Sequence, residues 1–230
     1  HSCNQCHLNN SRGVPPATGT ALTKYVIKVG TENGAPDPML GEVLQPADSK
    51  GEPSVSISGW DEADGLRKPK FAFTGANAPA HFSPRVSPQI VGMGLLEAIT
   101  ELDILKLDDP DDKNGDGISG RARLLKDPEL GVTRLGRFGW KAGQASVRHQ
   151  VAGALKTDMG VLTSVFPKPD CGSAQTNCGA EAAEYSDTDL ADATAYISLL
   201  SVRAQRNWAA PEVLKGKELF TSTGCANCHV

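Results

Sequence analysis

Two pentapeptides decide how this chain builds its interior: Cys3-Asn4-Gln5-Cys6-His7 and Cys225-Ala226-Asn227-Cys228-His229. Both have the spacing C-x-x-C-H, which is the attachment signature of c-type haem. One helical turn with a two-residue gap lets both thiols reach the two vinyl groups on one edge of a porphyrin. The adjacent imidazole then turns onto the iron. We therefore predict two covalently bound haem c groups, one on Cys3, Cys6 and His7 and one on Cys225, Cys228 and His229.

Other interpretations of these cysteine pairs fit less well. A single C-x-x-C could be a redox dithiol or half of a zinc site. Zinc would require the two cysteine pairs to come together, and the adjacent histidines would then have no role as ligands. The repeated pattern in one short chain therefore favours haem over zinc or a dithiol.

Length and composition set further limits. The chain has 230 residues, 39% of them hydrophobic and 22% charged, as in one large globular domain or two small ones. Its 23 Lys and Arg against 27 Asp and Glu form no basic stripe, so we expect no nucleic-acid partner. No apolar run approaches the roughly 20 residues of a membrane helix, so no transmembrane segment is expected. Only 5% of the residues are aromatic, which suggests that haem fills part of the core.

The third cysteine pair, Cys171 and Cys178, flanks a polar, turn-like segment and has no following histidine. Haem c is attached outside the cytoplasm, where disulfides persist. We therefore predict a local disulfide and a periplasmic or extracellular location, the alternative being two free thiols. The chain opens at His1 without a signal peptide, so an exported protein would be represented here by a mature form or a fragment.

We expect a mostly α, cytochrome c-like di-haem fold with long loops and one small β-hairpin. The apolar spacing predicts helices over residues 94–107, 144–158 and 186–203, and a fourth helix that begins at Pro211. Alternating residues predict a hairpin from 54–58 and 66–73. Segments 8–52 and 75–88, rich in glycine and proline, are expected to be mostly loop.

An acidic segment over residues 108–120 resembles a calcium loop. Asp112, Asn114 and Asp116 fall at positions 1, 3 and 5, and Ile118 would offer its carbonyl at position 7. Arg123 stands where an EF-hand has its glutamate, so Asp109, Asp111 or more distant groups would have to complete the shell. We predict calcium here, because packed carboxylates repel one another without a cation; the alternative is a solvated acidic turn.

The second haem motif comes at the very end of the chain. Residues 206–230 look like the start of a second cytochrome c-like unit, following a first domain over 1–205 that carries the calcium-type loop and the disulfide. Such a unit completes its haem pocket with residues after the motif, and only Val230 follows. Either the sequence is truncated, or other parts of the protein or another chain complete the site. Head-to-tail assembly of copies is one hypothesis that explains haem motifs at both ends.

Several longer segments resemble the di-haem oxidoreductase family, over nearly the whole chain. They include Arg134-Leu135-Gly136-Arg137-Phe138-Gly139-Trp140-Lys141-Ala142, then Gln150, Asp158-Met159-Gly160 and residues 83–88, 92–99 and 114–121. Members are often labelled thiol oxidoreductases. They are distant relatives of bacterial di-haem cytochrome c peroxidases and of the di-haem enzyme that matures methylamine dehydrogenase.

The resemblance implies roles for three residues. Trp140 would relay electrons between the haems, and Gln150 and Asp158 would match the distal-pocket amide and acid that handle bound peroxide. An acid beside the iron is chemically sensible, because O–O cleavage needs a proton for the leaving oxygen. The spacing from Gln150 to Asp158 is shorter than in the peroxidases, and aspartate replaces glutamate. Structural interpretations stand beside these: a core aromatic, a helix-surface amide and a helix-end carboxylate.

The sequence leaves several candidates for the distal iron ligands. His81 and His149 are candidates, although a lone histidine is more often a surface residue. Two distal histidines would give low-potential iron suited to electron transfer, a methionine would raise the potential, and an empty position would admit peroxide. The weaker candidates are His1, Met39, Met93 and Met159.

Two functions follow. The first is extracytoplasmic electron transfer, with a redox partner protein or neighbouring copies of the chain. The alternative is a di-haem peroxidase or oxidase that reduces hydrogen peroxide at an open haem. The incomplete second unit and the spare histidines favour transfer narrowly. Thiol oxidation by Cys171 and Cys178 is disfavoured, because the pair lacks C-x-x-C spacing.

Overall fold

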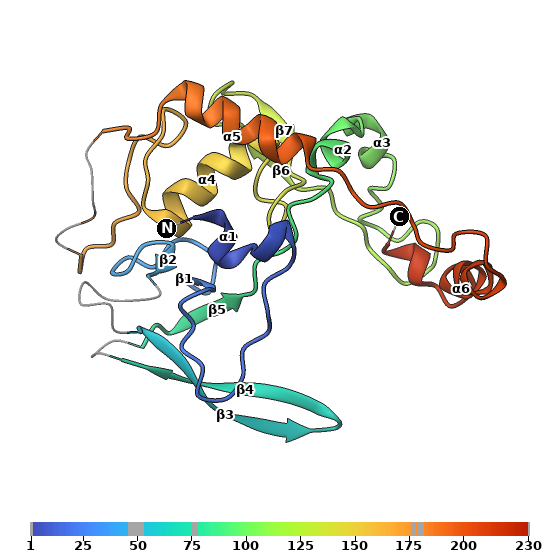
Figure 1. The fold of residues 1–230 in the computed structure, drawn as a ribbon, viewed down its shortest axis with the longest axis horizontal. Coiled ribbons are helices and arrows are strands. Elements are labelled where there is room, and N and C mark those ends of the chain that lie inside the picture. Colours follow the sequence, from blue (N-terminus) through green and yellow to red (C-terminus); the bar gives the residue numbers. More distant parts are fainter. Residues whose placement is uncertain (1, 46–52, 75–77, 176–177, 179–181, 230) are drawn as a thin grey trace.

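The computed structural model describes residues 2–45, 53–74, 78–175, 178 and 182–229. It is 28% helical and 20% strand, and its described residues form three small sheets (Figure 1). The prediction of a mostly α fold is therefore wrong. The physical reason is that several short segments, expected to be loop, pair with one another as strands.

The three-stranded sheet is built from such segments. Strand β1 (Val26–Gly30) lies between β2 (Val43–Leu44) and β5 (His81–Arg85), and both pairings are antiparallel. Alternate side chains of β1, Ile27 and Val29, are buried. Pro84 is tolerated because β5 is an edge strand, where a missing N–H breaks no central ladder.

The predicted hairpin is confirmed, and it is longer than expected. Strand β3 (Val55–Ala63) pairs with β4 (Leu66–Phe73) through a turn at Asp64 and Gly65. Both turn residues have positive φ, 52° and 75°, as the favoured two-residue hairpin turn requires. Val55 and Ile57 on the inner face join Leu22 and Ile27 of the preceding segment in one buried cluster.

Two of the predicted helices form the second core. Helices α4 (Val147–Met159) and α5 (Asp187–Leu199) pack together. Each begins after a serine, Ser146 or Ser186, whose side chain accepts a hydrogen bond from a backbone N–H of the first turn. Their buried cluster consists of Ala152, Leu155, Val165 and Leu190.

The single helix predicted over residues 94–107 is wrong: the chain forms α2 (Met93–Ala98) and α3 (Glu101–Leu105) instead. Ile99 is extended, with ψ of 127°, and Thr100 caps α3 by accepting a hydrogen bond from Asp103 N. Arg137 explains the break. Its Nη1 donates to the carbonyls of Leu96, Glu97 and Ile99 at 2.6–3.2 Å, so it satisfies oxygens that a continuing helix would use. Two short strands, β6 (Leu124–Lys126) and β7 (Thr133–Leu135), pair next to this region.

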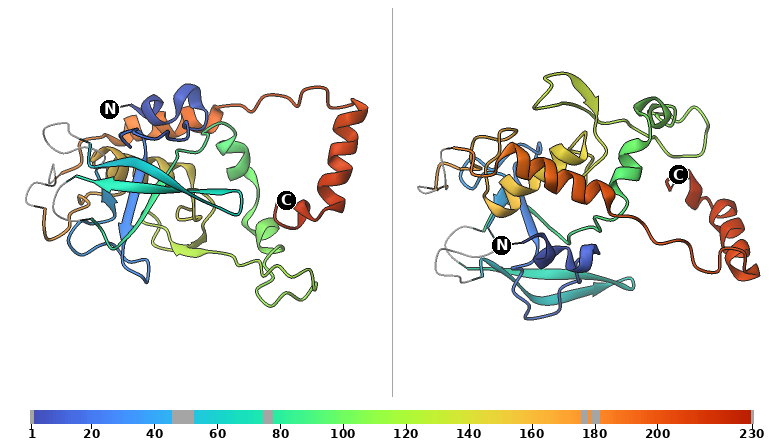
Figure 2. Two further views of the ribbon diagram at one scale, coloured as in Figure 1. Left: turned by 90° about the horizontal axis from the view of Figure 1, so that it is seen from below. Right: turned by 45° about the horizontal axis from the view of Figure 1, so that its top comes forward.

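The two ends of the chain lie differently. Helix α1 (Cys3–Cys6) and the 3₁₀ turn η1 (Leu8–Asn10) lie against the body, where Asn10 Nδ2 donates to the hydroxyl of Tyr196 on α5. Helix α6 (Pro211–Ser222) and the turn η2 (Cys225–Asn227) stand apart from it (Figure 2), beyond the exposed residues 201–209. The predicted boundary after residue 205 falls in this exposed segment, and the division into domains stays a prediction.

Cys171 and Cys178 form the disulfide that their spacing predicted. Within the described ranges, no helix combines the length and the apolar character needed to cross a membrane.

Candidate haem sites

Both C-x-x-C-H pentapeptides form the same local turn. The backbone N–H of His7 donates to the carbonyl of Cys3 at 2.8 Å, and that of His229 donates to the carbonyl of Cys225 at 3.0 Å. All four cysteines of the two motifs are free thiols. The turn therefore brings each pair of thiols and its histidine to one place, as haem attachment requires.

The imidazole of His7 is held from outside its own motif. Its Nδ1 lies 2.6 Å from the carbonyl oxygen of Pro88, which can only accept, so Nδ1 carries the proton. Nε2 is then the nitrogen with a free lone pair. A metal-binding histidine characteristically donates its other N–H to such an acceptor, which fixes its tautomer and ring orientation. His7 therefore fits the role of an iron ligand.

The segment that holds His7 also holds the motif's backbone. The hydroxyl of Ser87 donates to the carbonyl of Cys6, and the Ser87 carbonyl accepts from Gly13 N at 2.9 Å. Ser87 itself is only 6% exposed. The first motif is thus fastened to the segment that follows β5 at more than one point.

Trp140 is attached to this same segment. Its Nε1 donates to the carbonyl of Val86 at 3.1 Å, while 59% of the residue remains exposed. That exposure does not fit the interpretation of Trp140 as a core aromatic. The indole is anchored through one atom beside the first motif and leaves most of its ring surface open to a ligand or partner.

Asp158 lies in the last turn of α4 with its carboxyl near the first motif. Surrounding protein raises the pKa of this carboxyl by desolvation, although the residue itself is exposed at the surface. A hydrogen bond from Thr157 Oγ1 at 2.8 Å and the charges of Lys28, His7 and Arg85 act in the opposite direction. Asp158 also helps burial to raise the pKa of the Cys6 thiol. A carboxyl whose pKa is raised near a predicted haem ligand can hold and deliver a proton.

Gln150 is on the same helix, about two turns before Asp158. Its Oε1 is buried without a hydrogen-bond partner. A buried carbonyl oxygen without a donor is costly, unless a ligand with an O–H or N–H group supplies one. The orphaned acceptor fits a small oxygen ligand better than it fits a helix-surface amide.

The structure places the two candidate distal histidines in different settings, and their role as iron ligands stays a prediction. His149 is buried in α4, and its Nδ1 accepts a hydrogen bond from Ala145 N at 3.3 Å. With Nδ1 accepting, Nε2 carries the proton and is not available to a metal in this arrangement. Desolvation lowers the pKa of this imidazole, so it is neutral at pH 7. His81 is exposed at the start of β5, opposite Gly30. Arg85, at the other end of that strand, lies about 13 Å further along, and Pro88, which binds His7, follows three residues later.

The second motif has fewer contacts. Cys225 and Cys228 are exposed, and the ring of His229 lies 6.2 Å from that of Phe220 on the adjacent helix α6. Leu214, Leu219 and Phe220 of α6 are all partly exposed, which is the apolar lining that a porphyrin needs on its edge. These residues fit one side of a haem site.

The carboxylates of the acidic loop accept hydrogen bonds from backbone N–H groups of the same loop. Asp109 accepts from the N–H groups of Lys113 and Asn114, Asp112 accepts from Gly117, and Asp116 accepts from Ile118. In the part of the chain that the structure describes, no three His, Cys, Asp or Glu side chains gather as ligands for a metal. Calcium therefore stays a prediction, with Asp112, Asn114, Asp116 and Ile118 as its expected ligands.

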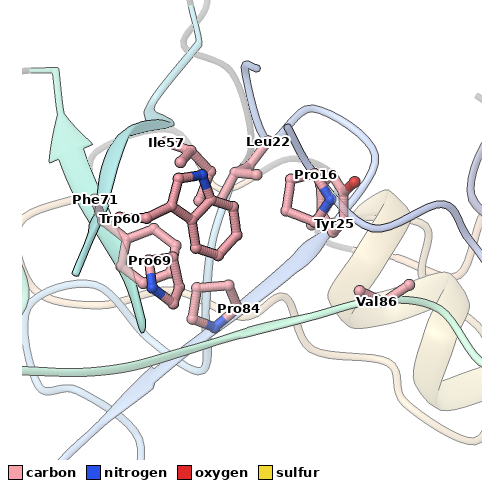
Figure 3. Close-up of a pocket in the computed structure, with 9 residues that line it drawn as sticks. All are labelled: Pro16, Leu22, Tyr25, Ile57, Trp60, Pro69, Phe71, Pro84 and Val86. Carbon is pink, nitrogen blue, oxygen red and sulfur yellow. The ribbon is translucent and has the colours of Figure 1, made fainter. Parts of the chain in front are cut away.

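A small apolar pocket lies beside the hairpin β3–β4 (Figure 3). Its walls include Trp60, Phe71, Tyr25 and Pro84, and it extends to Val86. None of the residues predicted to hold haem line it, so we do not assign it to either haem.

The donor sets at both ends are those of a haem-binding redox protein. Residues 80–230 match the family model described as "Di-haem oxidoreductase, putative peroxidase". The match includes Trp140, Gln150, Asp158 and the second motif, and it covers more than half of the chain. The chain therefore belongs to the di-haem oxidoreductase family and has a haem-based redox function. The comparisons with curated proteins and with solved structures each found no match.

Sequence reasoning missed Gly13, Ser87 and Pro88. Ser87 and Pro88 lie in a segment expected to be loop, and Gly13 lies in a stretch with several glycines and prolines. The resemblance of residues 83–88 to the family assigned Ser87 and Pro88 no role, because that role depends on contacts with residues about 80 positions away.

Proposed function

We propose that this chain is a di-haem oxidoreductase that reduces hydrogen peroxide at its first haem, with Asp158 as the proton donor. The observation that carries the proposal is the carboxyl of Asp158 in the last turn of α4, which lies within electrostatic range of the first motif and has a pKa raised by desolvation. The occupied Nδ1 of His149 supports an open coordination position, because it leaves that ring without a lone pair for iron. The family description is consistent with peroxidase activity.

In this proposal, different residues attach the haems, bind peroxide, deliver the proton and relay electrons. Cys3, Cys6 and His7 hold the first haem, covalently through the thiols, and Cys225, Cys228 and His229 hold the second. When bound, the haems supply the two electrons that, with two protons, convert hydrogen peroxide to two waters. With haem in place, Gln150 Oε1 would accept a hydrogen bond from peroxide, and the Asp158 carboxyl, about two helical turns further along α4, would deliver the proton that the leaving oxygen needs. Trp140, anchored on Val86, stands as the relay toward the second haem.

Optical spectra of the purified protein, oxidised and reduced, before and after peroxide, test the proposal. We expect one high-spin haem that reacts with peroxide, and a turnover about 10²- to 10⁴-fold lower in Asp158→Asn, as for loss of a general acid. Asp187→Asn is a matched control, because Asp187 is an exposed carboxylate at the start of α5. Two six-coordinate, low-spin haems that are inert to peroxide would contradict the proposal.

That result would favour the second candidate, an electron-transfer cytochrome. One observation supports it: α6 and the segment before it expose Trp208, Leu214 and Leu219, a surface that a neighbouring copy or redox partner could cover. Head-to-tail assembly would then cap the second haem. Sedimentation of the haem-loaded protein checks this, and a monomer with two fully coordinated haems would exclude it.

The remaining proposals concern location and calcium. We place the protein in the periplasm or outside the cell, because covalent haem attachment and the Cys171–Cys178 disulfide both belong to that environment. For calcium, isothermal titration of the chelator-treated protein with Ca²⁺ is the direct test. Asp112→Asn should weaken binding, whereas an absence of heat with the unmodified protein would leave the segment as a solvated turn.

A further inference from the structure

We propose that Ser87 is a positioning residue, which holds the His7 imidazole and the Trp140 indole in one hydrogen-bonded unit. The inference rests on the proposed function in one respect, namely that His7 binds the first haem. It assigns a role to a residue that contacts neither the haem ligand atom nor peroxide.

The unit is built on three consecutive residues. The carbonyl of Val86 accepts from Trp140 Nε1, and the carbonyl of Pro88 accepts from His7 Nδ1. The carbonyl between them, that of Ser87, accepts from Gly13 N. In extended backbone, successive groups alternate in direction, so the first and third carbonyls face one way and the second faces the other. Pro88 favours this conformation, because the residue before a proline is biased to the extended region.

Ser87 fixes this arrangement from the opposite side. Its hydroxyl donates to the carbonyl of Cys6, the residue before His7. Two neighbouring hydrogen bonds, Ser87 to Cys6 and His7 to Pro88, therefore join the same two segments. The fit is close: a Cβ added to Gly13 would lie 2.7 Å from Ser87 Oγ and 3.2 Å from the Cys6 carbonyl. Because Ser87 is buried, water is poorly placed to replace its hydroxyl.

The consequence concerns the basicity of His7. A strong hydrogen bond from Nδ1 makes the imidazole a more basic ligand, which stabilises the oxidised iron and lowers the reduction potential. Loss of the Ser87 hydroxyl frees the segment to shift, lengthens the His7–Pro88 bond and raises the potential of the first haem. The Trp140–Val86 bond loosens with it.

The experiment uses the full, haem-loaded chain in a Cys225→Ala/Cys228→Ala background, so that the potential measured belongs to the first haem. We expect Ser87→Ala to shift the midpoint potential upward and Ser87→Thr, which keeps a hydroxyl, to restore part of it. Ser58→Ala is the matched control. Its hydroxyl also donates to a backbone carbonyl, that of Lys70, but in the hairpin away from the motif.

A double-mutant cycle with Trp140→Phe separates positioning from general loosening. Phenylalanine lacks the N–H donor, so we expect Ser87→Ala to shift the potential less in its presence than alone, because both changes free the same segment. If Ser87→Ala does not yield folded protein, Gly13→Ala serves instead, since its Cβ displaces the Ser87 hydroxyl without removing it.

The possible outcomes are distinct. Haem bound to the first motif with an unchanged potential in Ser87→Ala, or in Gly13→Ala where that variant replaces it, overturns the inference and leaves the proposed function standing. Fully additive shifts in the cycle overturn the claim of one unit. Lack of haem on Cys3 and Cys6 in the background protein itself overturns both the inference about Ser87 and the proposed function, because His7 would then have no iron to hold.

Discussion

The first and second haem motifs have the same pattern and the same local turn but different surroundings. In the first, the histidine ring is bound to Pro88 and the backbone to Ser87, both about 80 residues away. In the second, the ring contact of His229 is with Phe220, on the helix that immediately precedes it. The comparison teaches that C-x-x-C-H determines the turn and the donor atoms, whereas distant residues determine how firmly the ligand is held. Two sites with equal signatures can therefore differ in potential, stability and reactivity.

Removing the thiols of each motif gives the largest expected difference. Cys3→Ala/Cys6→Ala and Cys225→Ala/Cys228→Ala should each lose one of the two covalent haems, measured as pyridine haemochrome. Only the first pair should also lower the melting temperature of the body, because among the described residues it is the first motif that hydrogen bonds tie into the body. Equal losses of stability would show that α6 packs on the body more firmly than its exposure indicates.

The pH dependence of peroxide turnover tests whether the first haem site has the proton donor that we propose, Asp158. Desolvation by neighbouring atoms raises the pKa of Asp158 above the usual 3.8, so its protonated, proton-donating form persists to higher pH than in a fully solvated aspartate. Turnover should therefore fall as the pH rises through that raised pKa. The rate profile of Asp158→Asn should lack this limb. A wild-type rate that is independent of pH above 3.8 would remove Asp158 from the proton transfer.

Core substitutions compare the body with the C-terminal helix. Leu190 in α5 is fully buried, whereas Leu219 in α6 is 49% exposed. Leu190→Ala should lower the free energy of unfolding by about 2–5 kcal/mol, as for other buried leucines. Leu219→Ala should change it by no more than about 0.5 kcal/mol. Urea denaturation of the two variants measures both, and a large loss at Leu219 would mean that α6 is covered in solution.

The smallest expected effect is the contribution of His149 to acid sensitivity. Desolvation lowers its pKa in the folded chain, so the unfolded chain binds the proton more readily. The free energy of unfolding should therefore fall as the pH drops below about 6.5, by at most about 1.4 kcal/mol per pH unit. His149→Gln should reduce the slope of the unfolding free energy against pH. A slope that is unchanged by the substitution would mean that iron or a bound group already occupies the ring.

The sequence predicted elements whose signals are local. The helix start at Pro211 and the alternation of β3 and β4 depend on neighbours within a few residues, and each element formed. The disulfide and the turns of both haem motifs are local in the same way.

Elements that depend on partners far along the chain were missed. Strand β1 alternates over only five residues with Lys28 in the middle, and β5 contains Pro84, so neither resembles a typical strand until β1 finds its two neighbours. In the candidate site, the residue types were apparent from the motifs. The supports of His7 were not, because hydrogen bonds across about 80 residues leave no periodic trace.

Arg137 has a consequence for the order of folding. Its guanidinium ends α2 by binding carbonyls 38 to 41 positions earlier, so the bend at Ile99 is specified by a contact that forms only after a long loop closes. Before closure, Thr100 can already cap a helix that begins at Glu101, but the apolar helical pattern of residues 93–105 continues across it. We expect the separation of α2 from α3 to become fully fixed only when Arg137 docks, although Thr100 marks its position locally.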